Sequence, residues 1–98
     1  MDRMTEEQVN NELAGLTDWN LIDEKWIERI YRFKKYLAGV RFVDKVAESA
    51  ENKQHHPLIA IDYKKVSVKF SSWQEKGLTS VDFEMAKRVD VIYEELEQ

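Results

Sequence analysis

The 98 residues suffice for one domain with one core, and a composition of 43% hydrophobic and 35% charged residues is that of a globular protein. A formal net charge of −4 argues against a general nucleic-acid surface, which needs a concentrated basic face. The absence of cysteine excludes disulfides, thiolate zinc sites and cysteine nucleophiles. No apolar run has the length of a membrane span, and the charged N-terminus does not resemble a signal peptide. We therefore expect a single domain over residues 1–98, cytoplasmic, that contacts neither membrane nor nucleic acid directly.

The first predicted element is a helix that begins after Thr5. Thr5 is an N-cap residue, two acids follow in the first turn, and Gln8 occupies the capping-box position. An apolar stripe over residues 9–16 continues the pattern, and Gly15 marks the C-terminal end.

A β-hairpin is predicted next, because residues 19–22 and 26–33 are rich in aromatic and β-branched residues and are separated by a polar turn. In the second run, apolar and polar residues alternate only imperfectly. Ile27 and Tyr31 share one parity, which Arg29 interrupts, while Trp26 and Ile30 lie on the other. We expect both faces of this hairpin to be partly covered, one by helices and one by a partner subunit.

A long helix is predicted from about Lys34, where apolar residues begin to recur every three or four positions. The expected inward face is formed by Leu37, Val40, Val43, Ala47 and Ala50, flanked by Tyr36, Phe42 and Val46. Glu51 falls on the trailing edge of this face. Its carboxylate is therefore expected to point toward the interior end of the helix, near the histidines.

Both histidines, His55 and His56, stand between this helix and Pro57, the only proline. Beyond it, residues 58–63 and 66–70 predict a second hairpin, residues 71–77 a loop, and Thr79 the N-cap of a last helix with Asp82 at its third position. The order α-β-β-α-β-β-α predicts an α+β fold: a four-stranded antiparallel sheet with helices packed on one face.

Three interpretations of the histidine pair remain open at this point. The pair can be a polar helix corner, it can bind a metal, or it can move protons, since histidine titrates near neutral pH. Zinc usually takes three or four protein ligands, which favours acid–base chemistry over a metal site. Asp82 can be explained as a capping acid alone, although its place on the apolar stripe favours an inward role. Trp73, in a polar loop, can cover the core or form a flat wall for a planar ligand.

The joint spacing of these residues is more specific than any one of them. The series Glu51, His55-His56-Pro57, Tyr63, Trp73 and Asp82 resembles the signature of the pterin-4a-carbinolamine dehydratases. The likeness extends over residues 33–51, which resemble that family's central helix, and over residues 77–82, which resemble the start of its final helix. It covers the chain from about Leu13 to the C-terminus, and the predicted element order agrees with the family fold.

The resemblance implies a hydro-lyase that converts a 4a-hydroxytetrahydropterin into quinonoid dihydropterin and water, a step in tetrahydrobiopterin recycling. It implies His55 as principal acid–base group, His56 as an assisting group that also binds the pterin, and Glu51 and Asp82 as carboxylates that set imidazole charge and orientation. No metal or other cofactor is implied, because the pterin is the substrate. The implied substrate contacts are His55, His56, Pro57, Ser72, Trp73, Gln74 and Glu75.

The resemblance departs at Trp73, where mammalian members carry a third histidine, so we expect slower or more stereochemically biased turnover. Some family members also serve as dimerisation cofactors of a transcription regulator, which is the alternative function. Small size, strands with two apolar faces and the family habit together predict a homodimer or homotetramer.

Overall fold

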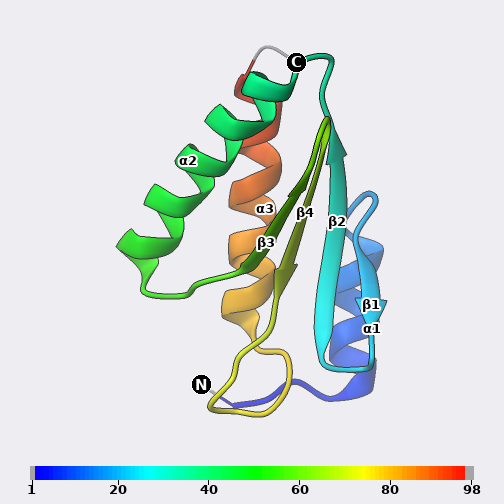
Figure 1. The fold of residues 1–98 in the computed structure, drawn as a ribbon. Helices are drawn as coiled ribbons and strands as arrows, with labels where there is room; N and C mark the ends of the chain where they lie inside the picture. The colour runs from blue at the N-terminus through cyan, green and yellow to red at the C-terminus, as the bar shows by residue number, and fades with distance from the viewer. Residues whose placement is uncertain (1, 97–98) are drawn as a thin grey trace.

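The computed structural model describes residues 2–96, which form one four-stranded antiparallel sheet with three helices on one of its faces (Figure 1). The elements are α1 (Glu6–Ala14), β1 (Asn20–Ile22), β2 (Trp26–Arg32), α2 (Tyr36–Lys53), β3 (Leu58–Asp62), β4 (Lys65–Phe70) and α3 (Ser80–Glu95). The strands lie in the order β1-β2-β4-β3. The predicted fold class and element order are therefore confirmed. Within residues 2–96, no helix combines the length and apolar character needed to cross a membrane.

The predicted local signals act at the ends of the elements. The Thr5 hydroxyl accepts a hydrogen bond from the Gln8 N–H, and the Gln8 side chain accepts one from the Thr5 N–H, which completes the capping box of α1. Tyr63 adopts a left-handed conformation (φ 51°) in the two-residue turn between β3 and β4. The capping box and the turn each involve residues close together in the sequence, which is why the sequence alone locates them.

The sheet has one covered face and one open face. Ile27, Tyr31, Val66, Val68 and Phe70 point toward the helices and are fully buried. Their neighbours along the strands, such as Ile30 and Lys65, point the other way and remain exposed. Buried side chains of the helices and strands together form one contiguous apolar cluster. Apolar burial of this kind supplies the main favourable free energy of folding.

The inward face of α2 differs from the predicted one, and this part of the sequence interpretation was wrong. The buried residues are Ala38, Gly39, Phe42, Val46 and Ala50. Of the five residues predicted to face inward, only Ala50 is among them, because Leu37 and Ala47 are exposed and Val40 and Val43 are half-buried. The large Phe42 ring determines the orientation, because it packs against Tyr31, Phe33 and Tyr93 of the core. Gly39 completes the face, since a Cβ atom there would lie 3.3 Å from both Phe33 and Val66.

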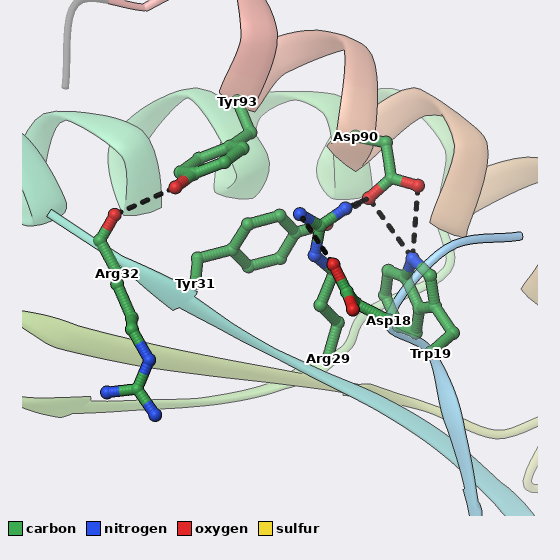
Figure 2. Close-up of polar contacts among 7 residues, drawn as sticks. All are labelled: Asp18, Trp19, Arg29, Tyr31, Arg32, Asp90 and Tyr93. Carbon is green, nitrogen blue, oxygen red and sulfur yellow. Dashed lines mark hydrogen bonds and ion pairs between the residues drawn. The ribbon is translucent and has the colours of Figure 1, made fainter.

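Arg29 lies on the covered face, and its inward position accounts for the imperfect alternation of β2. Its Nη1 lies 2.8 Å from Oδ1 of Asp90 on α3, and its guanidinium lies 4.4 Å from the centre of the Tyr31 ring (Figure 2). Asp90 also accepts hydrogen bonds from the Tyr31 hydroxyl and from Trp19 Nε1. A charge can be buried when it is paired, and Arg29 is paired through Nη1 although its buried Nε has no hydrogen-bond partner. We call Trp19, Arg29, Tyr31 and Asp90 the Asp90 network.

Replacing Asp90 with Asn should destabilise the protein markedly. The substitution keeps the shape but removes the charge that lies 2.8 Å from the mostly buried Arg29 guanidinium, and only the exposed Asp18 carboxylate at 3.7 Å then remains as a counter-charge. The free energy of unfolding should fall by about 3 kcal/mol. Urea denaturation measures the loss. The matched control is Glu84→Gln on the same helix, whose exposed pair with Lys53 should contribute under about 1 kcal/mol. Equal effects of the two substitutions would contradict a structural role for the network.

The Asp90 network also predicts a loss of stability at alkaline pH. Burial, and then the hydrogen bond and negative charge of Asp90, raise the pKa of the Tyr31 phenol far above its usual value near 10. Above pH 10 the unfolded chain releases this proton while the folded chain keeps it, so stability falls by up to about 1.4 kcal/mol per pH unit. Urea unfolding between pH 9 and about pH 11.5 should show this slope. Tyr31→Phe should remove the slope, whereas Tyr63→Phe, which alters an exposed phenol, should retain it.

Candidate active site

Four elements meet at one end of the sheet, where α2 ends, β3 begins, β4 ends and α3 begins (Figure 1). Gln54 ends α2 in a left-handed conformation (φ 56°), and the His55 N–H then donates to the Ala50 carbonyl oxygen at 3.0 Å. Proline at position 57 prevents further helix and directs the chain into β3. The two histidines therefore lie at a fixed corner rather than in a free loop.

His55 is paired with Asp82 from the first turn of α3. Its Nε2 lies 2.6 Å from Asp82 Oδ1, although 27 residues separate the two in sequence. The Asp82 side chain is fully buried, whereas 18% of the His55 side chain is exposed. The His55 ring also stacks on Phe70, with an interplanar angle of 9° and 6.1 Å between ring centres. The imidazole is thus held by its edge and its face, with part of the ring open to solvent.

The second oxygen of Asp82 is occupied by protein donors. Oδ2 accepts a hydrogen bond from the Thr79 N–H at 2.9 Å and one from the Ser72 hydroxyl at 2.8 Å. The Thr79 contact is the predicted capping interaction, so Asp82 caps α3 with one oxygen and contacts His55 with the other. The capping and inward interpretations of Asp82 are both correct.

His56 is paired with Glu51 in a more open setting. His56 Nε2 lies 2.7 Å from Glu51 Oε1, and the two side chains are 59% and 71% exposed. Glu51 does lie next to a histidine, as expected, but its carboxylate faces solvent and not the interior. The buried face of α2 contains Phe42 and Ala50. Glu51, the residue after Ala50, therefore points away from the core.

The loop residues occupy three different environments. Ser72 is buried, Gln74 and Trp73 are exposed, and Glu75 is half-buried. Trp73 is 69% exposed, and its ring lies nearly perpendicular to that of Trp26, with 5.0 Å between ring centres. Trp73 therefore does not cover the core, and its exposed indole is available to a planar ligand. Pro57 lies half-buried beside His56.

Two residues of this region were not singled out in the sequence. The Phe70 ring stacks on the His55 ring, and the Trp26 ring packs against the Trp73 ring. Phe70 is the last inward residue of a clearly alternating strand, so its burial was predictable but its histidine partner was not. No sequence pattern indicated a role for Trp26, because it begins the strand in which Arg29 interrupts the alternation of apolar and polar residues.

The two pairs have a defined hydrogen-bonding polarity. A carboxylate can only accept, so the Nε2 atoms of His55 and His56 carry the hydrogens that face Asp82 and Glu51. The Nδ1 atom of each ring then remains to accept or deliver a proton. A carboxylate behind an imidazole fixes its tautomer and its orientation, an arrangement that is used in acid–base catalysis.

Two other features near the site carry no such chemistry. A groove of about 650 Å³ between α2 and α3 is lined by charged residues of both signs, including Lys45, Glu48 and Arg88, but contains neither histidine. In the part of the chain from residue 2 to 96, no three side chains of metal-binding type gather closely enough to hold an ion. Neither feature involves the paired histidines.

The comparison with known proteins identifies the family. Residues 2–92 match the model described as pterin 4 alpha carbinolamine dehydratase. The chain belongs to this family. Among relatives named provisionally as pterin-4-alpha-carbinolamine dehydratases, one from Gloeobacter violaceus is 40% identical over 88% of this chain and 97% of its own. Another, from Halobacterium salinarum, is 38% identical over 91% of this chain and 94% of its own.

A solved structure of the same family has the same fold. The protein from Brucella melitensis described as a transcriptional coactivator/pterin dehydratase has a TM-score of 0.90 and 31% identity, and the match covers 94% of this chain and 99% of that one. The paired histidines and carboxylates thus lie on a pterin dehydratase fold, and the resemblance inferred from the sequence is confirmed.

The two carboxylates should differ strongly in their contribution to stability. Asp82→Ala removes the cap of α3 and leaves the buried Ser72 hydroxyl and Thr79 N–H without their acceptor, so the free energy of unfolding should fall by about 2–4 kcal/mol. Glu51→Ala removes only an exposed pair and should lower it by less than about 1 kcal/mol. Urea denaturation at neutral pH compares the two, and similar losses would contradict the assigned difference in burial.

Proposed function

We propose that this protein is a hydro-lyase that converts 4a-hydroxytetrahydropterin into quinonoid dihydropterin and water, as in tetrahydrobiopterin recycling. The observation that carries the proposal is the 2.6 Å contact between His55 and the fully buried Asp82, at a corner shared with His56 and Glu51. Family membership supports the same substrate class. A histidine held in one tautomer and partly open to solvent is suited to transfer protons to and from a bound heterocycle.

The proposed reaction requires two proton transfers and no change in oxidation state. The C4a–O bond breaks, the leaving oxygen takes a proton to become water, and the neighbouring ring nitrogen loses its proton as a C=N bond forms. His55 is the principal acid–base group in this scheme, and Asp82 holds its ring in position. Because the oxidation state does not change, the scheme needs no redox cofactor, and in this proposal the histidines make both proton transfers without a metal.

His56 and Glu51 are proposed to assist and to bind the pterin. Their exposure leaves the His56 ring free to approach a ligand that rests on the corner formed by His55 and Pro57. The exposed Trp73 indole is proposed to stack on the flat bicycle, with Gln74 and Glu75 contacting its polar edge. Ser72 lies in the same loop and stays a proposed contact of the pterin, although its hydroxyl bonds to Asp82 and its backbone N–H and carbonyl group bond to Gly77.

The proposed assembly is a homodimer or homotetramer in the cytoplasm. Exposed apolar residues, among them Ile30, Leu37, Leu58 and Ile61, support association of copies of this chain. A second function as a dimerisation cofactor of a transcription regulator is favoured by one observation, the description of the Brucella melitensis protein as a transcriptional coactivator/pterin dehydratase.

His55→Ala tests the proposed enzyme function. Loss of the acid–base group should lower kcat/KM for 4a-hydroxytetrahydropterin by about 10²- to 10⁴-fold. Asn52→Ala, an exposed change in the last turn of α2, is the matched control and should keep full activity. Wild-type protein with no turnover would favour the interaction function, and unchanged activity of His55→Ala would refute the role of His55.

A further inference from the structure

Ser72 differs from the other proposed substrate contacts because its side chain does not face solvent. It is only 3% exposed, and its hydroxyl lies 2.8 Å from Asp82 Oδ2 and 2.8 Å from the Thr79 hydroxyl. A ligand at the histidine corner therefore cannot use this hydroxyl without breaking a buried hydrogen bond. The environment of Ser72 is that of a residue acting on Asp82.

The direction of these hydrogen bonds follows from the donors available. Asp82, as a carboxylate, can only accept, so the Ser72 hydroxyl must donate its one hydrogen to Oδ2. The Thr79 hydroxyl must then donate to the Ser72 oxygen. A donor chain therefore runs from Thr79 through Ser72 to Asp82 Oδ2, while the N–H of His55 donates to the other oxygen, Oδ1. Hydrogen bonds in such a chain reinforce one another in a buried setting.

The backbone on both sides of Ser72 is fixed by contacts of its own. Ser72 and Gly77 exchange two backbone hydrogen bonds, of 3.0 and 3.3 Å, which close the loop between them. The N-terminal segment lies across this closure, because the Met4 N–H donates to the Leu78 carbonyl oxygen at 2.7 Å. The stem of Arg3 lies so close to Gly77 that a Cβ atom there would approach it to 2.5 Å. The Ser72 hydroxyl is thus presented to Asp82 from a rigid frame.

We propose that Ser72 is a positioning residue that fixes the Asp82 carboxylate, and through it the orientation of the His55 ring. The catalytic consequence rests on the proposed dehydratase function, whereas the effect on the His55 ring does not. The neighbouring Ser71 provides a matched control. It is also a buried serine, but its hydroxyl donates to the Lys25 carbonyl oxygen and not to Asp82.

The first test observes the His55 ring directly by NMR on protein labelled with ¹⁵N-histidine. The Nε2 hydrogen of His55 should give a protected signal in the wild type, because it is bonded to a fully buried carboxylate. In Ser72→Ala its exchange with water should accelerate by about tenfold or more, since a hydrogen bond to a charged group is lost. Ser71→Ala should leave the exchange rate near the wild-type value, and Ser72→Thr, which restores a hydroxyl, should restore the protection.

The second test measures kinetics with 4a-hydroxytetrahydropterin. Ser72→Ala should lower kcat by about ten- to a hundredfold while KM remains nearly unchanged, because the residue acts through Asp82 rather than on the substrate. In an Asp82→Asn background the same substitution should cause no further loss of kcat. Urea denaturation of each variant confirms that it is folded under the assay conditions.

The outcomes separate this proposal from the proposed function. Unchanged His55 protection in Ser72→Ala, or an increase in KM alone, would overturn the positioning role while leaving the dehydratase assignment intact. Equal acceleration of exchange in Ser71→Ala would also overturn it, because the effect would then be a general loosening of the loop. If the wild type has no activity, the NMR comparison still decides whether Ser72 holds the Asp82–His55 pair.

Discussion

The arrangement of the candidate site depends on the burial of one carboxylate. Asp82 has no exposed surface, so protein donors must replace all the water that would otherwise solvate it. These donors come from the end of α2, from the loop after β4 and from the first turn of α3. The hydrogen bonds that Asp82 needs therefore bring three separate segments together, and one of these segments carries His55. The imidazole is oriented by the same interaction that allows the carboxylate to be buried.

The two histidine rings are consequently held to different extents. His55 is held by a buried partner and by the face of Phe70, whereas His56 is held only by an exposed carboxylate on the same helix end. An exposed ion pair contributes little and can exchange with water or with a ligand. The corner therefore combines one fixed imidazole with one adaptable imidazole, which is a reasonable division between proton transfer and ligand contact.

A second anionic position on α3 fixes the rest of the helix. Asp90 lies eight residues after Asp82 and also faces the sheet, where it binds Arg29, Tyr31 and Trp19 (Figure 2). Apolar contacts between these two positions are non-directional, while hydrogen bonds to a carboxylate require defined geometry. The two carboxylates thus determine where α3 lies along the sheet, and the Asp90 network supports the site from a distance.

The sequence by itself determined the element order, the capping boxes, the turns and the helix-to-strand corner that carries both histidines. All of these depend on residues a few positions apart, whose interactions are set by the local backbone. Only the tertiary structure decided that His55 pairs with Asp82, that the buried Ser72 hydroxyl bonds to Asp82, and that Arg29 points inward to Asp90. It also decided the buried face of α2, because the space available to Phe42 lies among core residues far away in sequence. Such contacts depend on how helices and strands pack against one another, and no periodicity within a single segment records that packing.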